Sequence, residues 1–163
     1  MPQEIERKFL VASDDWKRDA GPGQSLRQAI VFSEGDRILR IRLVEGKPAR
    51  LTVKIGIDAT RRHEYEYPVP DEHAEELLRM ANGTMISKTR YNIPHAGYVW
   101  EVDCYHGPLD GLVTAEVEMA GVDEDPAIPA WIGREVTGDR RFSNQALAEG
   151  SLGADWRHHA LSP

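Results

Sequence analysis

The sequence predicts a mainly β (α+β) fold in which eight antiparallel strands close into an up-and-down barrel. Two observations lead to this prediction. Eight segments are predicted to be β-strands, and most of them alternate apolar and polar residues with the period of two that is typical of a β-strand. On seven of them, one face carries charged residues two positions apart, or a single lysine, and after the first segment these charges are nearly of one sign along each strand. A barrel would gather these faces around one interior, which can hold a small ligand.

The composition is that of an ordinary globular protein. The chain has 163 residues, of which 40% are hydrophobic and 29% charged, so we expect one domain over residues 1–150 and a loosely held tail over 151–163. The net charge of −7 argues against a nucleic-acid-binding protein, because phosphate contacts need a basic surface. Cys104 is the only cysteine, which favours a reducing compartment. No signal peptide or membrane helix is recognisable, so we expect a cytoplasmic protein without a membrane partner.

The first predicted strand, residues 4–10, carries the most informative charges. Glu4, Glu6 and Lys8 share one face, opposite apolar residues. Carboxylates suit a hard divalent cation, which prefers oxygen ligands, and an ammonium group suits a phosphate. Alone, this pattern is typical of a solvated strand face, but its return along later strands favours a site for a metal-chelated polyphosphate.

The next elements alternate in the same way. A short helix at residues 13–18, with Ser13 as its N-cap, precedes a strand at 25–33 that is rich in β-branched and aromatic residues. Two basic strands and one acidic strand are then expected at 37–45, 50–56 and 62–69, with Arg40 and Arg42, Lys54, and Glu64 and Glu66 on their charged faces.

The second half begins with a helix. Asp71 is expected to cap this helix, which runs through Met80 and has an apolar stripe at helical spacing. A turn at 94–97 separates the next two strands. The last three strands, at 84–93, 98–105 and 112–120, carry Lys88 and Arg90, Glu101 and Asp103, and Glu116 and Glu118. A final helix is expected at 139–150, packing through Phe142, Ala146 and Leu147.

An open antiparallel sheet with a solvated outer face is the alternative to a barrel. Solvated faces normally mix charges with uncharged polar residues, and nothing there requires one sign per strand. Inside a barrel, like charges would repel one another unless a ligand compensated them. A polyphosphate would compensate the bases, and divalent metals would compensate the acids. A metal ion can also lower the pKa of a bound water so that it attacks phosphorus, and no serine or cysteine nucleophile is then needed.

The order of these motifs resembles the CYTH superfamily, or triphosphate tunnel metalloenzymes. The E-x-E-x-K start is the hallmark of that family, and the resemblance covers roughly residues 3–150, including a C-terminal helical plug. The motifs that carry it are Glu4-x-Glu6-x-Lys8, Arg40-x-Arg42, Lys54, Glu64-x-Glu66, Lys88-x-Arg90, Glu101-x-Asp103 and Glu116-x-Glu118. The chain is most similar to the short bacterial members that hydrolyse inorganic tripolyphosphate.

The resemblance implies an eight-stranded antiparallel β-barrel tunnel with a few short outer and C-terminal helices, which binds a small-molecule triphosphate with Mg²⁺ or Mn²⁺. The implied phosphate-binding residues are Lys8, Arg40, Arg42, Lys54 and Arg90. The implied metal ligands are Glu4, Glu6, Glu116 and Glu118, with Asp103 as a further candidate. Catalysis would involve Glu4, Glu6 and Lys88, of which Lys88 binds phosphate or orients the attacking water, while Glu64, Glu66 and Glu101 buttress the bases.

Other functions remain open from the sequence alone. Relatives in the family include adenylate cyclases of class IV type and thiamine triphosphatases, and a third possibility is a polyphosphate-binding module without turnover. Intact E-x-E pairs at both ends of the chain argue against a module that has lost its metal ligands. One departure concerns Ile30, which stands where close relatives often have a tyrosine. The oligomeric state does not follow from these patterns.

Overall fold

The computed structural model describes residues 3–81 and 85–150, and nine β-strands lie within these ranges. They are β1 Gln3–Val11, β2 Gln24–Glu34, β3 Arg37–Val44, β4 Arg50–Gly56, β5 Arg61–Pro68, β6 Ile86–His95, β7 Tyr98–Tyr105, β8 Val113–Glu118 and β9 Ile132–Glu135. The helices are α1 Asp71–Met80 and α2 Asn144–Glu149, with short 3-10 helices η1 Asp14–Arg18, η2 Gly107–Leu109 and η3 Arg140–Phe142. The strand expected at 84–93 begins at Ile86 in the structure. Residue 84 and the predicted tail at 151–163 lie outside the described residues.

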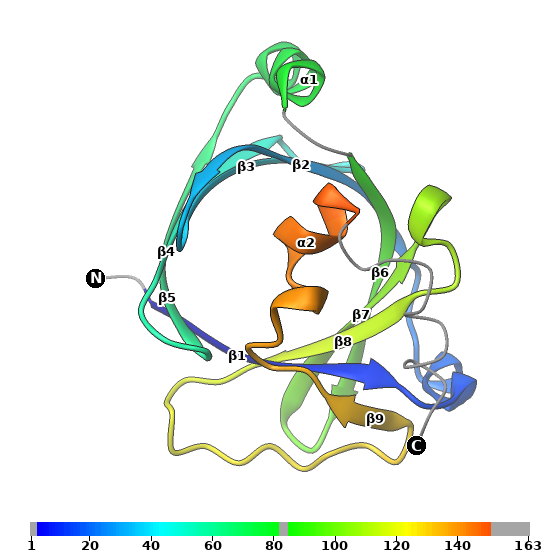
Figure 1. Ribbon diagram of the computed structural model, residues 1–163. Coiled ribbons are helices and arrows are strands. Elements are labelled where there is room, and N and C mark those ends of the chain that lie inside the picture. Colours follow the sequence, from blue (N-terminus) through cyan, green and yellow to red (C-terminus); the bar gives the residue numbers. More distant parts are fainter. Residues whose placement is uncertain (1–2, 82–84, 151–163) are drawn as a thin grey trace.

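Eight of these strands close into a ring whose interior we call the tunnel (Figure 1). Neighbouring strands pair in the order β5-β4-β3-β2-β6-β7-β8-β1, and β1 also pairs with β5, which completes the ring. Every pairing is antiparallel. The predicted mainly β fold with eight antiparallel strands in a closed arrangement is therefore confirmed.

The up-and-down strand order that we predicted is wrong. β1 lies between β8 and β5, and β2 pairs with β6, so the links from β1 to β2 and from β5 to β6 join strands that are not neighbours. Those links contain η1 and α1, which give them the length to reach a distant strand, whereas tight turns join most other consecutive strands. The short strand β9, which we did not predict, pairs with β1 outside the ring.

The outer face of the ring carries the apolar residues that alternate with the charged ones. Ile41 and Ala49 are fully buried in a cluster with Ala74, a fully buried residue of α1. A second outer cluster contains Trp100 and Trp131, whose rings meet edge to face with their centroids 6.1 Å apart. Because the outer faces hold these cores, the inward faces are left for charged side chains.

The C-terminal helical segment, η3 and α2, lies inside the ring and is called the plug here (Figure 1). The continuous helix expected at 139–150 is interrupted at Ser143, because its hydroxyl accepts a hydrogen bond from the backbone N–H of Ala146 and so begins a new helix. Phe142 and Leu147 are buried against Leu10 and other apolar residues of the strands. The plug thus packs against an apolar patch within the tunnel.

Two local predictions are also corrected. Asp71 does not cap α1; Pro70 is the N-cap, and the Asp71 carboxylate instead accepts a hydrogen bond from the backbone N–H of Ala49. The turn expected at 94–97 is shorter, because β6 continues through Pro94, opposite Val99 on β7. In the described part of the chain, no helix has both the length and the apolar character to span a membrane.

Candidate active site

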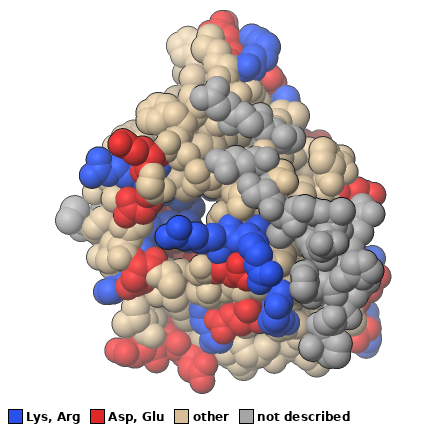
Figure 2. Space-filling model, in the orientation of Figure 1, with Lys and Arg blue, Asp and Glu red and all other residues tan. Residues whose placement is uncertain are grey.

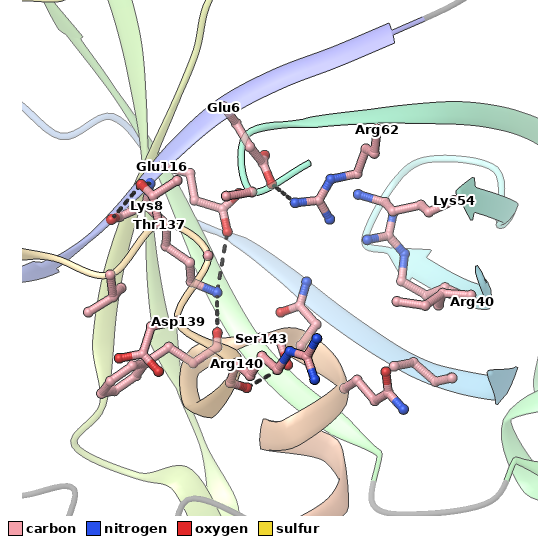
Figure 3. A pocket seen from close by; sticks show the side chains of 18 residues that line it. Glu6, Lys8, Arg40, Lys54, Arg62, Glu116, Thr137, Asp139, Arg140 and Ser143 are labelled. Carbon is pink, nitrogen blue, oxygen red and sulfur yellow. Dashed lines mark hydrogen bonds and ion pairs between the residues drawn. The ribbon is translucent and has the colours of Figure 1, made fainter. Parts of the chain in front are cut away.

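The strands and the plug enclose a cavity of about 170 Å³ inside the tunnel (Figure 3). The predicted site residues that line it are Glu6, Lys8, Arg40, Lys54 and Glu116. Figure 2 shows a hollow near the centre of this face of the molecule, bordered by Lys and Arg atoms with Asp and Glu atoms beside them. The cavity therefore has walls of both charges, contributed by strands far apart in the sequence.

The other predicted residues lie around this cavity. Glu4 and Glu118 border a second recess of about 490 Å³, together with Glu64 and Glu66. Arg42, Lys88, Arg90 and Asp103 line neither space; they lie on the inward faces of β3, β6 and β7, and all are at least half-buried. The structure thus gathers the predicted residues in one tunnel but separates them into distinct neighbourhoods.

Most charges in the tunnel are already paired with an opposite charge on another strand. The Lys54 ammonium lies 3.0 Å from the Glu4 carboxylate and 3.3 Å from that of Glu64. Lys8 lies 3.5 Å from Glu116 and donates a 2.7 Å hydrogen bond to the plug carbonyl of Phe142. Our expectation that like charges stay uncompensated without a ligand is therefore wrong for these groups, because strands of opposite sign are neighbours in the ring.

Asp103 is the most completely paired of the acids. Its two oxygens accept hydrogen bonds from the Lys88 ammonium at 2.7 Å and from the Arg90 guanidinium at 2.7 and 2.8 Å. The Asp103 side chain is 1% exposed. Burial raises the pKa of Asp103, but Lys88 and Arg90 more than offset this and hold it below its usual range. We call Asp103, Lys88, Arg90 and Glu101 the clamped cluster, since Glu101 also accepts a hydrogen bond from Arg90 at 2.7 Å.

Lys88 lies in the interior of this cluster. Its pKa is lowered, first by burial and then by the nearby guanidinium groups of Arg90 and Arg42, while Asp103 opposes the change. Both Asp103 oxygens are bonded to bases, so a metal ion at Asp103, the role suggested by the sequence, would have to displace Lys88 or Arg90.

Two arginines on β3 are less fully compensated. Arg42 donates two hydrogen bonds, of 3.0 and 2.9 Å, to the neutral Gln28 side-chain oxygen. Burial, followed by the charges of Arg40 and Arg90, lowers the pKa of Arg42 to about 9. The Arg40 side chain is buried, and its Nε has no hydrogen-bond partner in the described structure. A buried surplus of positive charge of this kind suits an anionic ligand.

A surplus of negative charge lies nearby at Glu6. Burial, followed by the carboxylates of Glu116 and Glu4, raises the pKa of Glu6 to about 8, although Arg62 and Lys54 pull it down. The pKa values of Glu4 and Glu118 are also raised, chiefly by burial. Glu116 differs: burial raises its pKa, but Lys8 and Arg90 bring it down to about 2. Glu6 therefore lacks enough cationic partners to stay ionised at neutral pH.

This donor set fits a hard divalent cation. Carboxylate oxygens are the ligands that such ions prefer, and Glu6 lies directly opposite Glu118 in the β1–β8 register. The described residues contain no ready-made cluster of three or more Asp, Glu, His or Cys side chains that could hold a metal ion. A cation would therefore have to open some of the ion pairs described above.

Several cavity residues were missed by the sequence analysis. Arg62 lies 3.0 Å from Glu6 and 3.5 Å from Glu4, and extending the two-residue period back from Glu64 would have placed it on the charged face. Gln28, which does not line the cavity but accepts hydrogen bonds from Arg42, was also missed. Arg140 and Asn144 line the cavity from the plug, and no periodic pattern indicates that a C-terminal segment enters the tunnel.

Known proteins are similar to this chain over most of its length. Two proteins named inorganic triphosphatase are similar to the chain. One, from Acetivibrio thermocellus, is 40% identical over 150 residues, covering 91% of this chain and 95% of its own. The other, from Nitrosomonas europaea, is 38% identical over 151 residues, with coverages of 89% and 96%.

Structural and family comparisons agree with these relatives. The crystal structure of an inorganic triphosphatase matches with a TM-score of 0.65 and 34% identity, covering 91% of this chain and 95% of that one. The model of the CYTH domain matches residues 2–145, a span that takes in the whole ring and the start of the plug. The chain therefore belongs to the CYTH domain family.

Proposed function

We propose that this protein hydrolyses inorganic tripolyphosphate to pyrophosphate and phosphate in the tunnel, with Mg²⁺ or Mn²⁺. The observation that carries the proposal is a buried basic surplus at Arg40, which lines the cavity, and at Arg42 on the same strand, together with a carboxylate surplus at Glu6 in the same cavity. Triphosphatases of the CYTH family are metal-dependent in general. The names of the two similar proteins support the same substrate.

The basic residues bind the substrate in this proposal. Arg40, Arg42 and Arg90 offer forked guanidinium donors to phosphate oxygens, and Lys8 and Lys54 act as point charges. The buried guanidinium groups of Arg40 and Arg42 have few anionic partners of their own, so a phosphate would satisfy donors that the fold leaves poorly compensated. The side chains of Lys8, Arg40 and Lys54 are largely buried, and the lower local dielectric strengthens their contacts with an anion.

The carboxylates Glu4, Glu6, Glu116 and Glu118 hold the divalent cation in this proposal. Such an ion supplies charge neutralisation for the phosphates and lowers the pKa of a bound water. In the reaction, the oxygen of the attacking water would form a bond to a terminal phosphorus and the bridging P–O bond would break, so that pyrophosphate leaves and the proton of the water passes to solvent. We assign Lys88 to orienting the water or a phosphate oxygen, because Asp103 fixes its ammonium group in position.

Measuring phosphate release from tripolyphosphate, ATP and thiamine triphosphate at equal concentration, with Mg²⁺ or Mn²⁺ and chelator controls, tests the proposal. We expect metal-dependent turnover with a strong preference for tripolyphosphate. Formation of cyclic AMP from ATP would identify an adenylate cyclase, and a preference for thiamine triphosphate would identify that activity instead. Tight tripolyphosphate binding without turnover would leave a binding module.

A further inference from the structure

Arg62 has an unusual position among the cations of the tunnel. It lies at the start of β5, opposite Glu4, where β1 and β5 close the ring with only three residue pairs. Its guanidinium group contacts both carboxylates of the first strand, Glu6 at 3.0 Å and Glu4 at 3.5 Å. Arg62 also lines the cavity, and Figure 3 shows its guanidinium on the same side as Lys54 and Arg40.

The two carboxylates that Arg62 contacts are those we assign to the divalent cation. A guanidinium group and a dication of like sign cannot share the same carboxylate oxygens without strong repulsion. Loading of the cation would therefore require Arg62 to leave Glu6 and Glu4. The residue opposite Arg62 on β4 is Gly56, so no side chain from that neighbour blocks its movement.

We propose that Arg62 is an exchangeable partner of Glu4 and Glu6, which contacts their carboxyl groups when no metal is present and transfers its guanidinium to the phosphate chain when metal binds. Arg62 is then a further substrate-binding residue, and it couples the two ligands. Metal frees Arg62 for phosphate, and phosphate, by attracting Arg62, frees the carboxylates for metal. Coupling of this kind is reciprocal by thermodynamic necessity. Both the metal half and the phosphate half of the inference rest on the proposed function.

A purely structural role is the competing explanation, in which the ion pair only holds β1 to β5. The neighbouring residue provides a matched control. Arg61 belongs to the same strand and to the same short β1–β5 pairing. Its side chain is 40% exposed, forms an ion pair with Asp58 and does not line the cavity. Arg61→Gln removes the same formal charge one residue away.

The test measures two affinities by calorimetry, in the wild type, Arg62→Gln and Arg61→Gln. The first is the affinity of the chelator-stripped protein for Mn²⁺ in the absence of phosphate. We expect Arg62→Gln to bind Mn²⁺ at least about fivefold more tightly, because a competing cation has been removed. The second is that of tripolyphosphate for metal-free protein, which we expect to weaken about tenfold or more in Arg62→Gln. Arg61→Gln should change neither.

Each other outcome overturns part or all of the inference. Unchanged or weaker Mn²⁺ binding in Arg62→Gln would show that Arg62 does not compete with metal, and unchanged tripolyphosphate binding would remove it from the phosphate site. If Arg62→Gln does not fold, Arg62→Met, which keeps the aliphatic part of the side chain, is measured in its place. If Arg62→Met also fails to fold, Arg62 is a structural residue of the β1–β5 pairing. A wild-type protein that binds Mn²⁺ but not tripolyphosphate would instead contradict the proposed function.

Discussion

Glu6 and Asp103 are both carboxylates inside the same tunnel, but their surroundings differ. Asp103, in the clamped cluster, has hydrogen bonds to two bases on both oxygens and a pKa below its usual range. Glu6 has one guanidinium partner and two neighbouring carboxylates, and its pKa is raised to about 8. Burial favours the neutral form in both cases, so the neighbours decide the charge. The comparison teaches that a carboxylate with both oxygens bonded to bases holds those side chains in place, whereas a carboxylate with few cationic partners is available to a metal cation.

The largest expected effect is at Glu6. We expect Glu6→Gln to reduce metal-dependent tripolyphosphate hydrolysis by about 10³-fold, because it removes a carboxylate assigned to the cation. The fold should survive, since the neutral glutamine resembles the protonated form that burial already favours. Initial rates at saturating metal, together with circular dichroism, would check both statements. A loss of less than tenfold would contradict the assignment of Glu6 to the metal.

The complementary change is Asp103→Asn, which should act mainly on stability. It leaves Lys88 and Arg90 buried with less compensation, and breaking a buried ion pair costs about 3–5 kcal/mol. Denaturant unfolding would measure this. Glu101→Gln is the matched control, because Glu101 contacts the same Arg90 but is 34% exposed, and we expect a change below about 1 kcal/mol. Equal effects of the two substitutions would mean that Asp103 is not the centre of the cluster.

The same comparison predicts a dependence of stability on pH. Because the folded pKa of Glu6 exceeds its unfolded value of 4.5, the folded protein retains a proton that the unfolded chain has lost. The free energy of unfolding of the metal-free protein should therefore fall as pH rises from 5 to 7, by at most about 1.4 kcal/mol per pH unit from this group. Asp103 and Glu116 add no slope there, since both are ionised in folded and unfolded states above their lowered pKa values.

Thermal unfolding in chelator, compared between the wild type and Glu6→Gln, isolates this slope. Glutamine does not titrate, so the variant should lose the part of the slope that belongs to Glu6. The range stops at pH 7 because the lowered pKa of Lys88 adds a slope of opposite sign at higher pH. Parallel curves for the two proteins would mean that Glu6 is ionised in the empty tunnel.

The difference between Glu6 and Asp103 could not have been predicted from the sequence. Period-two alternation correctly assigned Arg40, Lys54, Glu64 and Glu116 to charged strand faces, because the side-chain direction depends only on the strand itself. The compensation of each charge depends on the neighbouring strands, and alternation carries no information about strand order. The predicted up-and-down order also places β8 beside β1 and β7 beside β6, but the register that sets Glu118 opposite Glu6 and Asp103 opposite Arg90 comes from the structure. Alternation likewise says nothing about the plug, which only the resemblance to the CYTH family implied.

The smallest expected effect concerns the basic counterpart of this comparison. Arg90 is held by two carboxylates, whereas the hydrogen bonds that Arg42 makes within the described residues go to the neutral Gln28, which is 2% exposed. Gln28→Leu should remove the acceptor without adding charge, so that Arg42 loses its orientation. We expect the KM for tripolyphosphate to rise about five- to tenfold with little change in kcat.

Steady-state kinetics of Gln28→Leu beside Ser25→Ala would test this expectation. Ser25 is an exposed residue of the same strand, so its substitution controls for changes in β2 itself. If kcat falls and KM does not change, Gln28 acts on the chemical step and not on substrate binding. If neither kcat nor KM changes, the orientation of Arg42 does not depend on Gln28, and a base without an anionic partner in this tunnel needs no neutral hydrogen-bond acceptor to bind phosphate.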